Sequence, residues 1–194
     1  MKRFIDILIC LPAVVILSPV FMVIAIWIKT DSTGPVLYLQ ERIGKSGKPF
    51  RIFKFRTMRT NADKHGLLTV GGRDPRVTGA GFYLRKYKLD ELPQLFNVLI
   101  GHMSLVGPRP EVKKYVDLYS TDQRKVLSVK PGITDYASIE YSNENELLAR
   151  SDDPESTYIK EVMPAKLRLN LKYIQEQSLV TDLRIIFQTL KKVF

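Results

Sequence analysis

The chain is poor in cysteine and has neither repeats nor low-complexity stretches. Its single cysteine, Cys10, excludes an internal disulfide and is compatible with a reducing compartment. Acidic residues are also scarce relative to basic ones, since 20 Asp and Glu face 30 Lys and Arg, for a formal net charge of +10. This excess favours anionic partners such as phospholipid head groups, nucleotides or nucleic acid, although a soluble basic protein has the same composition.

Charge is absent between positions 7 and 28, a run long enough for a helix that spans a membrane. A cleaved signal peptide is disfavoured, because the run is longer than a typical signal core. A straight spanning helix conflicts with the positive-inside rule. Lys2 and Arg3 precede the run and Lys29 and Arg42 follow it, so a straight span would place basic residues on both sides of the membrane.

A re-entrant helical hairpin keeps both basic flanks in the cytoplasm. Pro19 kinks a helix because it lacks a backbone donor, and the Ser18 hydroxyl can satisfy the freed carbonyl. Each arm is roughly 16 Å long, about half of a ~30 Å hydrocarbon core. We therefore expect residues 1–29 to form a membrane hairpin that breaks at Ser18 and Pro19, although kinked prolines also occur in ordinary spanning helices.

Residues 30–194 are expected to form a compact cytoplasmic catalytic domain, which makes the chain a mostly helical α+β protein. Residues 36–42 and 50–56 are strand-like and flank a Gly44-Lys45-Ser46-Gly47 turn, so a small β-hairpin is predicted. Residues 61–78 form a polar loop that either borders a site or is a simple surface connection.

The second half of the chain is predicted to be mainly helical. Ser120 and Gln123 match a capping box at the start of a short helix that ends before Pro131. Residues 163–177 form a basic helix, and an amphipathic helix follows. The apolar residues of that last helix are Leu179, Leu183, Ile186, Phe187, Leu190 and Phe194. They either pack on the core or dock at the lipid interface, with Lys191 and Lys192 near head groups.

An adjacent acidic pair, Asp90 and Glu91, lies among basic residues. Those neighbours are Arg85, Lys86, Lys88 and Arg109. The pair precedes Pro93 and an apolar run, so it is typical of a plain helix start. It also fits a phosphate-handling site. Helix N-termini attract anions, the cations can neutralise a diphosphate, and one carboxylate can attack phosphorus while the other engages a metal.

Four segments, matched in order, carry a resemblance to a known family. They are MKRFIDI…SPV, QERIGKSGKPFRIFKFRTM, DPRVTGAGFYLRKYKLDELPQLFNVLIGHMSLVGPRPE and VKPGIT. With these motifs the chain resembles the bacterial sugar transferases, here a small monotopic polyprenyl-phosphate phosphoglycosyl transferase. The resemblance covers nearly the whole chain.

This resemblance implies an enzyme that transfers a sugar 1-phosphate from a UDP-sugar to undecaprenyl phosphate and releases UMP. Such a reaction is the first membrane step of a bacterial glycan or glycoconjugate pathway. The expected location is the cytoplasmic face of the bacterial inner membrane, with both termini cytoplasmic. Anionic phospholipid is the expected surface partner, and nucleic acid is not an expected partner. A non-catalytic scaffold that binds anionic lipid is the rival interpretation.

The resemblance also assigns roles to residues. Asp90 is the expected nucleophile, which forms an aspartyl-phosphosugar intermediate, and Glu91 assists through Mg²⁺, for which both carboxylates are candidate ligands. The Pro-Arg-Pro motif is Pro108-Arg109-Pro110, whose Arg109 suits a bidentate phosphate contact. The remaining expected phosphate- and substrate-binding residues are Lys54, Arg56 and Arg85.

One segment departs from the family pattern. Many members continue the Lys-Pro-Gly-Ile-Thr motif with Gly-Leu, whereas this chain continues with Asp135 and Tyr136. Asp135 and Glu140 are either substrate contacts or surface acids, and the Asp152-Asp153 pair is expected at the surface.

Overall fold

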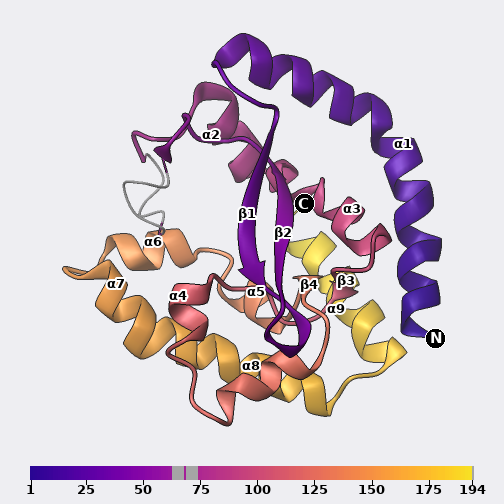
Figure 1. The fold of residues 1–194 in the computed structure, drawn as a ribbon, viewed down its shortest axis with the longest axis vertical. Coiled ribbons are helices and arrows are strands. Elements are labelled where there is room, and N and C mark those ends of the chain that lie inside the picture. Colours follow the sequence, from indigo (N-terminus) through magenta and orange to yellow (C-terminus); the bar gives the residue numbers. More distant parts are fainter. Residues whose placement is uncertain (63–67, 69–73, 194) are drawn as a thin grey trace.

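The computed structural model describes residues 1–62, 68 and 74–193. Its helices and strands, in chain order, are α1 (Lys2–Asp31), β1 (Leu37–Ile43), β2 (Pro49–Phe55), α2 (Gly79–Lys86), α3 (Gln94–Leu99), β3 (Ser104–Val106), α4 (Lys113–Val116), β4 (Gly132–Thr134), α5 (Tyr136–Glu140), α6 (Glu144–Ala149), α7 (Pro154–Thr157), α8 (Met163–Gln175) and α9 (Leu179–Val193). Figure 1 shows the β1–β2 hairpin along the middle of the molecule, α1 along its outer edge and α8 below. The mostly helical α+β prediction is confirmed, and most of the predicted polar loop at 61–78 lies outside the described residues.

The strands form two small sheets. β1 and β2 pair antiparallel, with Leu37 opposite Phe55 and Ile43 opposite Pro49, so the predicted β-hairpin is confirmed. β3 and β4 pair in parallel, with Ser104 opposite Gly132, a pairing that is absent from the sequence-based prediction. Parallel strands need a long connection, and here α4 and a 3₁₀ helix provide it.

The predicted capping box is present. The Ser120 hydroxyl accepts the Gln123 amide at 3.3 Å, and the Gln123 side chain accepts the Ser120 amide at 2.8 Å. The helix that it starts is a 3₁₀ helix, Gln123–Ser128, which ends before Pro131 as expected.

Helix α1 is continuous and, among the described residues, is the helix long and apolar enough to cross a membrane. It bends between its two ends and follows the side of the domain (Figure 1). The Ser18 hydroxyl donates to the Val15 carbonyl at 2.8 Å. Pro19 leaves that carbonyl without its helical donor, so the compensation predicted for Ser18 and Pro19 is present. The predicted break is therefore a bend within a continuous helix.

Both ends of α1 are tied to the same domain. At the start, the Asp6 carboxylate is buried and accepts the Ser104 hydroxyl and the Leu105 amide, each at 3.1 Å. At the end, the guanidinium of Arg56 donates to the carbonyls of Ser32, at 2.7 Å, and Thr33. Polar contacts thus fix α1 at both termini.

Between these ends, α1 is apolar both on the face that packs against the domain and on the face that points away from it. Its inner residues Cys10, Ile24 and Ile28 are buried. Its outer face leaves large apolar side chains exposed, including Phe4, Leu8, Leu11, Val15, Ile16, Met22, Val23 and Ile26. An apolar patch of this size is typical of a surface that contacts lipid or a partner.

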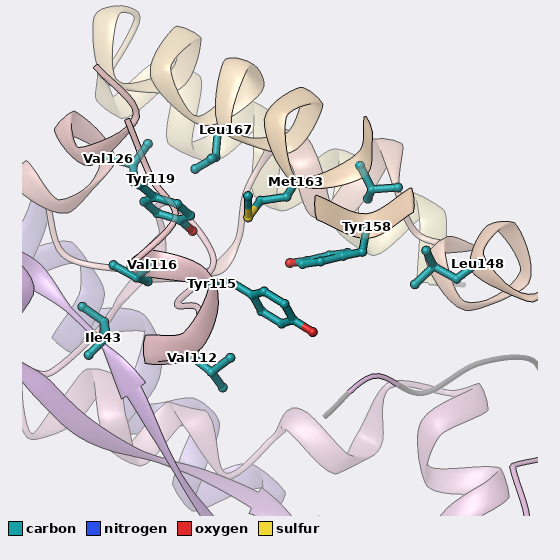
Figure 2. Packing of buried hydrophobic residues seen from close by; sticks show 11 residues of the cluster. Ile43, Val112, Tyr115, Val116, Tyr119, Val126, Leu148, Tyr158, Met163 and Leu167 are labelled. Carbon is teal, nitrogen blue, oxygen red and sulfur yellow. The ribbon is translucent and has the colours of Figure 1, made fainter. Parts of the chain in front are cut away.

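Among the described residues, four apolar clusters form the core, and two of them show how the domain is held together. The larger lies between α4, the β1 end and the α7–α8 region, where the Tyr115 and Tyr158 rings lie 4.8 Å apart and Met163 packs close by (Figure 2). The second lies under α1 and contains Cys10, Ile52 and Val98. The long apolar helix therefore contributes to the core and is not an appendage.

The C-terminal helix α9 presents an apolar face to solvent. Leu183, Phe187 and Leu190 are exposed, whereas Ile185 is fully buried. Ordinary core packing is thus wrong for these three residues, and a lipid interface stays a prediction. Phe194 lies outside the described residues. The basic helix expected at 163–177 is confirmed as α8, two residues shorter at its end.

Candidate active site

The acidic pair lies in a 3₁₀ turn, Leu89–Glu91, between α2 and α3. Lys88 precedes the turn in the left-handed conformation, with φ 56°. Pro93 occupies the N-cap of α3, so the pair comes just before that helix and not within its first turn. Asp90 is buried. The expected helix start is therefore correct in position, but the acids sit in their own tight turn.

Glu91 is held by two cations from distant parts of the chain. The Lys54 ammonium, on β2, lies 2.8 Å from Oε1. Arg109, in the loop after β3, donates one nitrogen to Oε2 at 3.0 Å and a second to Oε1. This is the two-pronged geometry in which a guanidinium binds a carboxylate most strongly. The structure thus brings together Lys54, Glu91 and Arg109.

The charges around Glu91 set its protonation. Burial alone would raise the pKa of Glu91, but the guanidinium of Arg109 and the ammonium of Lys54 hold that pKa well below its usual range. Burial also lowers the pKa of Lys54, and Glu91 opposes that effect. Glu91 is therefore an ionised carboxylate whose two oxygens are both engaged.

Asp90 behaves differently from its neighbour. Burial raises the pKa of Asp90, the adjacent Glu91 adds to the rise, and the cations Lys54, Arg85 and Arg109 oppose it. Within the described part of the chain, no donor makes a hydrogen bond to the Asp90 carboxylate. A buried carboxylate that is near cations but bound to none of them is available to a substrate or a metal.

Two further predicted residues have different positions. Arg85 donates its Nε to the Thr57 hydroxyl at 2.9 Å and contributes positive charge near Asp90. Arg56 is buried, and its guanidinium binds the carbonyls at the end of α1. The structure therefore brings Arg85 to the pair, whereas it places the Arg56 guanidinium against the end of α1.

The Pro108-Arg109-Pro110 loop is fixed by its surroundings. Pro108 and Pro110 are both buried. The Pro108 carbonyl accepts the Gly132 amide at 3.0 Å, and the Pro110 carbonyl accepts Arg42 at 3.2 Å. These contacts hold the backbone from which Arg109 reaches Glu91.

The acidic residues that follow the Lys-Pro-Gly-Ile-Thr motif differ in how far they are buried. Asp152, Asp153 and Glu140 are exposed, which confirms the surface prediction for the first two. Asp135 is fully buried, so a surface acid is wrong there. It accepts the backbone amides of Ser138, at 2.6 Å, and Arg109, at 3.0 Å. Sequence reasoning missed this contact, although its departure from the family pattern marked the position.

The donor set is compatible with Mg²⁺. The residues that the structure describes contain no group of three or more metal-binding His, Cys, Asp or Glu side chains. Mg²⁺ commonly uses one or two carboxylates and takes its other ligands from water and substrate phosphates. Asp90, which has no competing hydrogen bond from a described residue, meets that requirement, and Glu91 lies beside it.

Comparison with known proteins finds one matching family and several similar bacterial proteins. The model of the family described as bacterial sugar transferase matches residues 1–194. The chain is 38% identical over 195 residues to the UDP-N-acetylgalactosamine-undecaprenyl-phosphate N-acetylgalactosaminephosphotransferase of Aeromonas hydrophila, covering 99% of this chain and 43% of that protein. It is 40% identical over 197 residues to the UDP-glucose:undecaprenyl-phosphate glucose-1-phosphate transferase of Klebsiella pneumoniae, covering 100% of this chain and 40% of that protein.

A third relative is closer in length. The exopolysaccharide production protein PSS of Rhizobium leguminosarum bv. phaseoli is 38% identical over 197 residues, covering 97% of this chain and 92% of that protein. The chain thus spans about two fifths of the first two relatives and nearly all of the third.

The Glu91→Gln substitution tests the ion-pair network. Removing one partner of a buried pair costs about 3–5 kcal/mol, and we expect about 2–3 kcal/mol here because the Arg109 side chain is 34% exposed. Thermal unfolding in detergent micelles measures the change. The matched control is Asp117→Asn, which removes an exposed ion pair with Lys113 and should cost less than about 1 kcal/mol. Equal effects of the two substitutions would contradict a central role for Glu91.

Proposed function

Because the chain belongs to the bacterial sugar transferase family, we propose that it transfers a sugar 1-phosphate from a UDP-sugar to undecaprenyl phosphate. The Aeromonas and Klebsiella relatives are named for transfers of this kind to undecaprenyl phosphate. The observation that carries the proposal here is the division of the acidic pair. Glu91 is bound by two cations, while Asp90 is buried beside them with no hydrogen bond from a described side chain.

In the first step, an Asp90 carboxylate oxygen attacks the phosphorus that bears the sugar. The bond from that phosphorus to the bridging oxygen of the diphosphate breaks, and UMP leaves with the electron pair. In the second step, a phosphate oxygen of the lipid attacks the same phosphorus. The acyl-phosphate bond breaks, and Asp90 is regenerated as a carboxylate. The product is the sugar linked to the lipid through a diphosphate, which makes this the first membrane step of a glycan pathway.

The surrounding charges suit both steps. Phosphoryl transfer depends mainly on positioning and on stabilisation of negative charge. Arg109 and Lys54 carry positive charge next to Asp90, and Arg85 adds to it. Since Glu91 holds Arg109 and Lys54 in place, it organises the cations while Asp90 reacts. The raised pKa of Asp90 favours a more basic, and so more nucleophilic, carboxylate once it is ionised.

Mg²⁺ is the proposed cofactor. Asp90 would hold it together with the diphosphate of the donor, while Glu91, whose oxygens bind Lys54 and Arg109, would lie beside it. When bound, it would neutralise phosphate charge and stabilise the leaving UMP. The protein's own part is to keep the carboxylates and the three cations within one buried turn and its neighbours.

The contacts at both ends of α1 support a re-entrant topology. Arg3 donates to the carbonyls of Val98 and Leu99, and Arg56 binds the opposite end of α1, so one domain holds both ends. A straight span would separate one end from that domain. We therefore propose that α1 enters and leaves the cytoplasmic leaflet with its outer apolar face in lipid, and that both termini are cytoplasmic.

Other apolar surfaces extend the proposed membrane contact. On α9, Leu183, Phe187 and Leu190 are exposed, and Lys191 and Lys192 follow in the last turn. Near the end of α1, the Trp27 and Tyr83 rings lie 5.9 Å apart and both are partly exposed. Aromatic rings and lysines are enriched where membrane meets water. Anionic phospholipid is the proposed surface partner.

Substitution of Asp90 tests the reaction. The wild type, in membranes with undecaprenyl phosphate and Mg²⁺, is expected to release UMP from at least one member of a panel of UDP-sugars. Asp90→Asn should reduce release by at least about 10³-fold, because an amide cannot act as the nucleophile. Asp122→Asn is the matched control, since Asp122 is an exposed acid paired with Lys125. Substantial turnover by Asp90→Asn would exclude Asp90 as the nucleophile.

Accessibility labelling tests the topology. A cysteine inserted after Met1 should react with a membrane-impermeant maleimide only when the cytoplasmic face is open. The wild-type chain is the background control, because its single cysteine, Cys10, is buried. Labelling of the inserted cysteine in intact spheroplasts would rule out the re-entrant arrangement and favour a straight span.

A further inference from the structure

We infer that Asp135 is a positioning residue for the proposed transfer, one that fixes the backbone of Arg109 so that its guanidinium holds Glu91. The inference rests on the proposed function for its effect on turnover. The link from Asp135 through Arg109 to Glu91 does not depend on that function, because it rests on hydrogen bonds in the structure. Neither the family match nor the names of the relatives assign a role to this position.

One buried carboxylate joins two segments. Asp135 is fully buried, and its Oδ2 accepts the Arg109 amide at 3.0 Å. Its other oxygen, Oδ1, accepts the Ser138 amide at 2.6 Å and so caps the start of α5. Hydrogen bonds to a charged acceptor are roughly twice as strong as neutral ones. Asp135 therefore connects the loop that carries Arg109 to α5, the helix that directly follows β4.

The backbone around Asp135 is closely packed against the Arg109 loop. The Gly107 amide donates to the Thr134 carbonyl at 3.0 Å, directly before Asp135. A Cβ atom at Gly132 would lie 2.1 Å from the Gly107 nitrogen, so the two strands approach as closely as their backbones allow. The β3–β4 sheet thus brings the loop to Asp135, and the carboxylate then binds the amide next to Pro108.

Arg109 needs such support because its side chain is only partly packed. It is 34% exposed, yet it makes both hydrogen bonds of the bidentate pair with Glu91. A long side chain loses much conformational freedom when it adopts one geometry. A fixed backbone at Arg109 limits the places that its guanidinium can reach, and so lowers the conformational entropy lost when it pairs with Glu91.

Kinetics of Asp135→Asn provide the first test, with full-length protein in nanodiscs. Asparagine is a good helix cap, so Ser138 keeps its partner, but the side-chain amide faces the Arg109 amide with a donor where an acceptor was. We expect kcat/KM for UMP release to fall about tenfold, with folding intact. The matched control is Asp153→Asn, because Asp153 caps α7 through Ser156 at 3.0 Å and is exposed. That variant should match the wild type.

A double-mutant cycle separates positioning from general destabilisation. If Asp135 acts through Arg109, the tenfold loss should shrink to less than about twofold when Arg109→Lys is already present. A tenfold loss in both backgrounds, or no loss in either, would overturn the inference.

A spectroscopic measurement keeps the inference testable if no UDP-sugar is turned over, a result that would count against the proposed function alone. The side-chain ¹⁵N–¹H signals of Arg109, assigned by their loss in Arg109→Lys, report its pairing with Glu91. They should move toward those of mobile arginines in Asp135→Asn and stay in place in Asp153→Asn. Unchanged Arg109 signals in Asp135→Asn would refute the positioning role.

Discussion

The ion pair between Glu91 and Arg109, extended by Lys54, is the interaction on which the site depends. It connects the β-hairpin, the tight turn before α3 and the loop after β3. Each of these charges would be costly to bury alone. Together they neutralise Glu91, whereas Asp90 accepts no hydrogen bond from a residue that the structure describes. Two adjacent acids of similar chemistry therefore have different surroundings.

The same turn also connects the site to the membrane helix. The acidic pair precedes α3, and the carbonyls at the far end of α3 accept Arg3 from the first turn of α1. Asp6 binds β3, which leads into the Arg109 loop. The long apolar helix α1 is therefore attached to both segments that build the site. This arrangement provides a physical basis for the proposed reaction between a soluble nucleotide sugar and a lipid phosphate.

Local patterns allowed much of the fold to be predicted from the sequence. The β-hairpin, the capping box at Ser120 and the compensation of Pro19 by Ser18 each depend on residues close in the chain, and all three are present. The β3–β4 pairing depends on a close approach of Gly107 and Gly132, which no local pattern encodes. The contacts of Arg56 and Asp135 could not be predicted for the same reason. A buried arginine that binds helix carbonyls and a buried aspartate that binds a distant amide resemble substrate-binding or surface residues until the fold is known.

The most direct test of the account is to trap the covalent intermediate. The protein is incubated with Mg²⁺ and a UDP-sugar from which it releases UMP, without lipid acceptor, then quenched in acid and analysed by peptide mass spectrometry. The account predicts a sugar phosphate on the peptide that contains Asp90, and its loss when undecaprenyl phosphate is added before the quench. UMP release that requires the lipid and leaves no adduct, or an adduct on any other residue, would contradict it.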